Sequence, residues 1–160
     1  MAEPLKGSES IEMGAPGETV WRLVSDVTRM GEWSPETVGG AWTGGHTGPV
    51  VGATFAGRNR AGLMRWTGKC EVTVADPGRQ FTFVRPGPDG GTTWSYVIEP
   101  SDGGCRVTES FSQARLPPWP MRLMSRLVFG ADREDALRRS VHETLERLKA
   151  VAEKEAGAAT

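Results

Sequence analysis

Three polar side chains, Glu109, Tyr96 and Asn59, interrupt stretches of sequence that otherwise alternate like the apolar face of a sheet. Burial in an apolar cavity would raise the pKa of Glu109 toward neutrality, where a carboxyl works well as a general acid or base. Tyr96 would donate a hydrogen bond to a developing enolate oxygen, and Asn59 would add a second. The same pattern also suits a structural Glu109 that is paired with an arginine or lies at a solvated rim.

The alternation along predicted strands places these three residues on one face. We expect strands over residues 8–13, 54–60, 65–75, 80–85, 92–99 and 106–114, separated by turn signals. The inward face then collects large rings and aliphatic side chains: Phe55, Trp66, Cys70, Val72, Val74, Phe81, Phe83, Trp94, Ile98, Cys105, Val107 and Phe111. An apolar wall with a few polar groups is typical of a small-molecule site, and a filled core is the alternative.

Two short helices are expected after the first strand. Pro16 and Gly17 open the first, and Asp26 is placed to cap a second that ends near Met30. Residues 39–53 follow with six glycines but without the GxxxxGK spacing of a phosphate-binding loop. This stretch therefore predicts a glycine-rich hairpin with bulges rather than a nucleotide site.

The C-terminal part changes to a helical period. Leu137, Val141, Leu145 and Leu148 fall on one stripe and predict a long helix. Gly130 predicts a kink before it, and Asp132 is a candidate cap for the new start. The preceding residues Met121, Leu123, Met124 and Leu127 suit either the mouth of a cavity or ordinary core packing.

Charge and motif content exclude several classes of protein. The 19 basic and 20 acidic residues give a net charge of −1, which argues against nucleic acid as a partner. No apolar run opens the chain, so we expect no signal peptide, no membrane span and a cytoplasmic protein. No metal site is expected because Cys70, Cys105, His46 and His142 lack zinc-ligand spacing, and no cofactor motif occurs.

One basic cluster has two interpretations. Arg58, Arg60 and Arg65 flank a predicted hairpin. Such a cluster is usually a solvated face, and the alternative is a surface for an anionic ligand or a membrane.

Several short motifs resemble a known family. The segments are Ala15-Pro16-Gly17-Glu18-Thr19-Val20-Trp21, Trp33-Ser34-Pro35, Trp94-Ser95-Tyr96, Glu99-Pro100 and Gly104-Cys105-Arg106-Val107-Thr108-Glu109. They resemble the START-like, helix-grip superfamily known as SRPBCC, in its polyketide cyclase/dehydrase and lipid-transport branch. The resemblance implies an α+β fold, in which a curved antiparallel sheet of six or seven strands wraps around the long C-terminal helix. It covers one domain over residues 8–152, with residues 1–7 and 153–160 expected to be flexible.

The resulting functional hypothesis is binding or transport of a small hydrophobic or aromatic molecule, polyketide-like or lipid-like, in an internal cavity. The expected ligand-binding residues are Trp33, Phe55, Asn59, Trp66, Phe81, Phe83, Trp94, Tyr96, Glu109, Phe111, Met124 and Leu127. The first alternative is a cyclase or dehydratase that uses Glu109 and Tyr96 as catalytic residues. The second is a surface-acting interaction or stress-response module, with a homodimer as one possible form.

Overall fold

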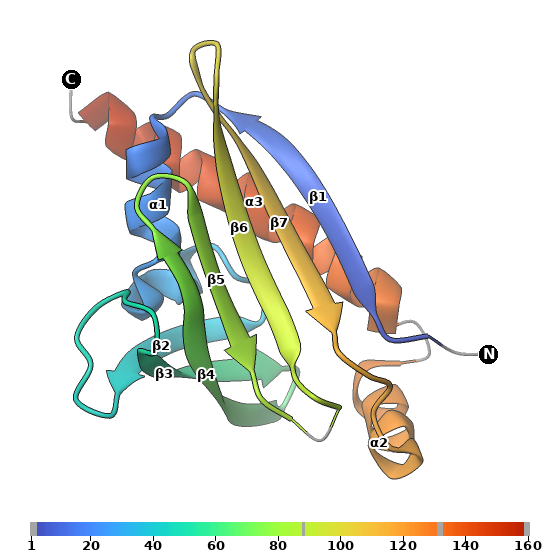
Figure 1. Ribbon diagram of the computed structural model, residues 1–160. Helices are drawn as coiled ribbons and strands as arrows, with labels where there is room; N and C mark the ends of the chain where they lie inside the picture. Colours follow the sequence, from blue (N-terminus) through green and yellow to red (C-terminus); the bar gives the residue numbers. More distant parts are fainter. Residues whose placement is uncertain (1–2, 88, 131–132, 159–160) are drawn as a thin grey trace.

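Seven antiparallel strands curve around a long helix in the computed structural model, which describes residues 3–87, 89–130 and 133–158 (Figure 1). The elements are β1 (Lys6–Met13), α1 (Gly17–Val24), the 3-10 helix η1 (Val27–Glu32), β2 (Thr37–Thr43), β3 (Thr54–Ala61), β4 (Met64–Asp76), β5 (Gln80–Arg85), β6 (Thr92–Ser101), β7 (Gly104–Gln113), α2 (Trp119–Phe129) and α3 (Arg133–Ala158). The strand order is β1-β7-β6-β5-β4-β3-β2. The predicted α+β architecture, with two short helices after the first strand, is confirmed.

Helix α3 crosses the concave side of the sheet diagonally (Figure 1). Its predicted apolar stripe is buried, with Leu137, Val141, Leu145 and Leu148 at most 6% exposed. These side chains pack against inward residues of the strands and form the main core. Strand β1 begins at Lys6 and α3 continues to Ala158, so regular structure extends beyond the predicted domain bounds at both ends.

The inward pattern of β4 changes at a bulge. Val72 lies opposite Phe83, but Val74 lies opposite Thr82, so Thr73 is an extra residue in the register. An extra residue reverses the alternation of every side chain that follows it. The prediction that Val74 points inward is therefore wrong, and Ala75, opposite Phe81, packs against the core instead.

Two local features fix the region after β1: a side-chain cap at the start of η1 and a close contact between η1 and β2. Asp26 accepts a hydrogen bond from the backbone N–H of Thr28 at 3.1 Å, as the capping prediction requires. The glycine-rich hairpin is also confirmed: β2 and β3 pair, with an irregularity between Thr37 and Gly39. Gly40 brings β2 against η1, because a Cβ there would lie 2.4 Å from the carbonyl oxygen of Val27.

Helix α2 is a separate element at the end of the sheet opposite α1 (Figure 1). The predicted kink at Gly130 is a complete break, and Gly130 has a φ of 85°, which favours glycine. The proposed cap Asp132 lies outside the described residues. None of the described helices combines the length and apolar composition needed to cross a membrane.

Candidate functional site

A cavity of about 680 Å³ lies between the concave face of the sheet and the helices α2 and α3. Its volume is within the range of small-molecule sites, which are usually lined by apolar and aromatic side chains. Eight of the predicted ligand-binding residues line it: Phe55, Asn59, Trp66, Phe83, Trp94, Tyr96, Glu109 and Phe111. The rings contact one another, with centroids 5.1 Å apart for Phe55 and Phe83 and 5.4 Å apart for Trp94 and Phe111.

Four predicted ligand-binding residues are placed elsewhere in the described structure. Trp33 and Phe81 are buried in the core and do not border the cavity. Met124 and Leu127 lie on the exposed side of α2, whereas Met121 lines the cavity. Because α2 is a separate helix, the side of it that faces the cavity could not be read from the stripe of α3.

Glu109 and Tyr96 form a hydrogen-bonded pair inside the cavity. They lie directly opposite each other in the pairing of β7 with β6. The Tyr96 hydroxyl donates to Glu109 Oε1 at 3.0 Å. The partner of Glu109 is therefore a tyrosine, and neither the arginine pairing nor the solvated rim of the structural alternative is found.

The environment of Glu109 favours its neutral form. The side chain is 2% exposed, and burial is the main reason that its pKa is raised to about 8. The hydrogen bond from Tyr96 acts in the opposite direction, and the negative charge of Glu9 adds to the increase. Among the described residues, Oε2 of Glu109 has no hydrogen-bond partner. A neutral carboxyl with a free oxygen can offer a proton to an acceptor on a ligand.

Asn59 lines the same cavity but does not join this pair. It lies on β3, four strands away from β7 in the sheet. Its Oδ1 accepts a hydrogen bond from Thr37 Oγ1 at 2.8 Å, and its Nδ2 donates to the carbonyl of Gly57 at 3.2 Å. Asn59 therefore holds the edge hairpin of β2 and β3 in place beside the cavity.

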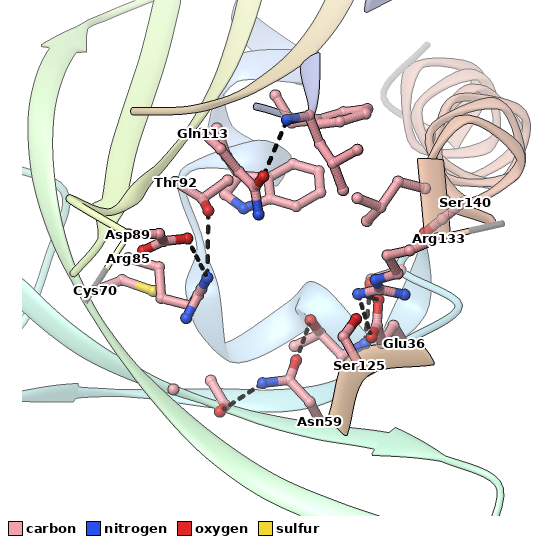
Figure 2. A pocket seen from close by; sticks show the side chains of 18 of the residues that line it. Glu36, Asn59, Cys70, Arg85, Asp89, Thr92, Gln113, Ser125, Arg133 and Ser140 are labelled. Atoms are coloured by element: carbon pink, nitrogen blue, oxygen red, sulfur yellow. Dashed lines mark hydrogen bonds and ion pairs between the residues drawn. The ribbon is translucent and has the colours of Figure 1, made fainter. Parts of the chain in front are cut away.

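Charged residues around the cavity were not anticipated from the sequence. Figure 2 shows Arg133 reaching across to Glu36, with an N–O distance of 3.1 Å. On another wall, Arg85 donates to Thr92 Oγ1 at 3.2 Å and lies 3.9 Å from the buried Asp89. These residues lie in loops or at element ends, where neither alternation nor helical period predicts the direction of a side chain.

The two thiols are buried. Burial raises the pKa of Cys70, which lines the cavity, to about 11, so it stays protonated near neutral pH. Cys105 is fully enclosed in the core. Within the described ranges, no group of three or more His, Cys, Asp or Glu side chains is arranged to hold a metal ion.

The family model for polyketide cyclase/dehydrase and lipid transport matches residues 4–153. The chain belongs to this family. A solved Polyketide_cyc-like protein of Corynebacterium glutamicum is 35% identical, with 97% of this chain and 95% of that chain covered and a TM-score of 0.61. No protein among the curated ones matches the sequence significantly.

More distant structures share the fold. The di-domain ARO/CYC StfQ of the steffimycin biosynthetic pathway is 15% identical with a TM-score of 0.74 over 97% of this chain, which corresponds to 52% of StfQ. The di-domain ARO/CYC BexL of the BE-7585A pathway is 20% identical, with a TM-score of 0.63, 91% of this chain covered and 45% of BexL. At these identities the likeness extends to the fold of one domain and not to activity.

Proposed function

We propose that this family member binds a small, mainly apolar molecule in its cavity and holds it by a hydrogen bond from Glu109. The observation that carries the proposal is the free Oε2 of a buried, neutral carboxyl in a ring-lined cavity of about 680 Å³. An unpartnered polar atom at such a depth is costly, and a ligand acceptor would offset that cost.

The lining defines the ligand's shape and polarity. Phe55, Phe83, Trp94 and Phe111 offer flat apolar surfaces, which suit an aromatic or polyene body. A carbonyl or hydroxyl oxygen on that body would accept the Glu109 proton. Polyketide-like and lipid-like molecules both meet these requirements.

Ligand binding is tested by thermal shift against a panel of apolar compounds with and without a carbonyl group, and by native mass spectrometry of the purified protein. The expected result is a rise in melting temperature with compounds that carry an oxygen acceptor. The panel is arranged in pairs of similar compounds, of which one carries a carbonyl group and the other does not. Glu109→Leu should remove the preference for the carbonyl-bearing compound of each pair. Glu99→Leu, an exposed position on β6, is the matched control. Equal shifts for both members of every pair in the unmodified protein would contradict the role of Glu109.

A cyclase or dehydratase is the second candidate, and the pKa of Glu109 favours it. In an intramolecular aldol cyclisation, an enol carbon of the substrate attacks a carbonyl carbon, and the carbonyl oxygen takes up a proton to become a hydroxyl. Glu109 would supply that proton, and Tyr96 would stabilise the resulting carboxylate through the hydrogen bond to Oε1. As the enol becomes a ketone it releases its hydroxyl proton, which returns to the Glu109 carboxylate and restores the neutral acid. The ARO/CYC relatives provide the analogy for such chemistry.

Catalysis and binding are separated by Glu109→Gln with a poly-β-ketone substrate mimic. If Glu109 transfers a proton, turnover falls by about 10²- to 10⁴-fold while the mimic still binds. Tyr96→Phe should lower turnover less, because it removes a positioning hydrogen bond. Unchanged turnover in Glu109→Gln would eliminate the catalytic proposal and leave the binding proposal standing.

A further inference from the structure

Helix α2 presents an apolar surface that nothing in the described part of the chain covers. Trp119 and Leu127 are 73% and 74% exposed, and Leu123 between them is exposed as well. These three residues are spaced by four and share one face of the helix, and the exposed Met124 borders it. Large apolar residues gathered on one helical face mark an interaction surface rather than chance exposure.

A second exposed apolar element lies at the same end of the molecule. The turn between β3 and β4 carries Leu63, which is 103% exposed, and Met64. Its position near the start of α3 follows from two contacts. Arg133 binds the Glu36 carboxylate, and the carbonyl of Glu36 accepts a hydrogen bond from the backbone N–H of Arg60.

Both elements are cationic. Residues 115–129 contain Arg115, Arg122 and Arg126 and no acidic residue. Residues 55–70 contain Arg58, Arg60, Arg65 and Lys69, again without an acidic residue. Arg60 and Arg65 lie directly opposite each other beside the exposed turn. Exposed apolar side chains flanked by arginines are the combination that anchors a protein at an anionic membrane surface.

We propose that α2 and the β3–β4 turn together dock on an anionic phospholipid bilayer. The apolar side chains of α2 and Leu63 enter the interface, and the arginines contact lipid phosphates. A second copy of this chain fits the surface less well. A two-fold contact through α2 would bring Arg122 and Arg126 of both copies together, and like charges repel.

The docked orientation places the cavity at the membrane. Met121 and Ser125 line the cavity from the other side of α2, and the exposed Arg122 and Arg126 border it at the edge of the apolar surface. A bilayer that receives the exposed side of this helix therefore lies next to the wall of the cavity that α2 forms. Docking goes beyond the proposed ligand binding and does not depend on it, since Glu109 takes no part in it.

The test is flotation of the full chain with phosphatidylcholine vesicles, with and without phosphatidylserine. The protein should float with the anionic vesicles and be released by added salt. Arg122→Gln combined with Arg126→Gln should weaken this binding roughly thirtyfold, at about tenfold per 1.4 kcal/mol. Arg60→Gln with Arg65→Gln should act in the same direction, and Leu123→Ser with Leu127→Ser should weaken binding even at low salt.

Matched controls use exposed residues away from α2 and the β3–β4 turn. Val50→Ser with Val51→Ser, in the loop before β3, and Arg22→Gln with Arg79→Gln should leave flotation unchanged. Circular dichroism establishes that each variant is folded. The proposal is overturned if the unmodified protein floats equally with and without phosphatidylserine, or if the control variants lose as much binding as the α2 and β3–β4 turn variants. It is also overturned if the leucine variant instead dissociates a dimer in sedimentation, because a second copy then covers α2.

Discussion

Glu9 lies directly opposite Glu109 in the pairing of β1 with β7. Opposed residues of an antiparallel pair point to the same face, so the two carboxyl groups are neighbours. The Glu9 carboxylate also binds Nδ1 of His142 on α3, at 2.5 Å. A solvent-exposed His–Glu pair thus lies beside the buried carboxyl.

Replacing Glu9 with Gln should lower the pKa of Glu109, because the negative charge of Glu9 disfavours a second negative charge nearby. Burial is the larger cause, so the pKa should remain above that of an ordinary glutamate. The pKa of His142 should fall as well, since its hydrogen bond to Glu9 raises it. NMR titration of the side-chain carboxyl carbons measures the pKa of Glu109, and titration of the imidazole ring signals measures the pKa of His142. Glu12→Gln, at an exposed position of the same strand, is the control and should leave Glu109 unchanged.

Stability should fall as the pH rises through the range 4.5 to about 8. In this range the folded protein keeps the proton of Glu109 while the unfolded chain releases it, so rising pH favours unfolding. The full effect is up to about 5 kcal/mol in the free energy of unfolding. Urea unfolding at a series of pH values should show the slope, and Glu109→Gln should flatten it. An identical slope in the variant would mean that Glu109 ionises normally in the folded state.

Gly40→Ala should destabilise the fold by about 1 to 3 kcal/mol, because the new Cβ would lie 2.4 Å from the carbonyl oxygen of Val27. The matched control is Gly48→Ala, whose Cβ would meet nothing within 4 Å. The control should change the free energy of unfolding little or raise it slightly. Chemical denaturation of both variants checks the difference. Equal effects would show that β2 can move away from η1 without cost.

Glu36→Gln should loosen the attachment of α3 to the segment before β2. The Arg133–Glu36 pair is partly shielded from solvent, so its loss should lower the free energy of unfolding by about 1 kcal/mol. Because this pair borders the cavity, hydrogen exchange at the start of α3 should accelerate, and a bound ligand should dissociate faster. Glu143→Gln, which breaks an exposed pair with Arg147 on the same helix, is the control. Identical behaviour of the two variants would mean that the Arg133–Glu36 pair does not brace the cavity.

The alternation of apolar residues in strands and their helical spacing predicted most of the fold. Each strand or helix buries one face, so apolar residues recur in the sequence with the period of that element. Val107, Glu109 and Phe111 follow a strand without irregularity, and all three are buried as parity requires. The alternation gave the wrong direction for the side chain of Val74, because a run of β-branched residues does not show where the register gains an extra residue. A bulge is fixed by the partner strand, which a local pattern does not contain.

The candidate site was less accessible to prediction than the fold. Parity predicts that Tyr96 and Glu109 share one face of neighbouring strands, but their direct opposition and their hydrogen bond depend on the register, which parity does not give. The pair of Arg133 and Glu36 joins positions 97 residues apart, and no periodicity relates them. The apolar character of Met124 and Leu127 predicts a place at the cavity, but composition does not tell which side of a short helix faces inward.

The pairing of β1 with β7 also has a consequence for how the chain reaches its folded state. Ser10 and Thr108, whose hydroxyls are hydrogen-bonded, are 98 positions apart. The hairpins from β2 to β7 join strands that are adjacent in the sequence, whereas β1 can pair only after β7 has formed. Joining such distant segments closes a long loop, and its entropic cost comes before most of the stabilising contacts of α3. We therefore expect docking of β1 to be a late step, with its partner edge of β7 open to other chains until then.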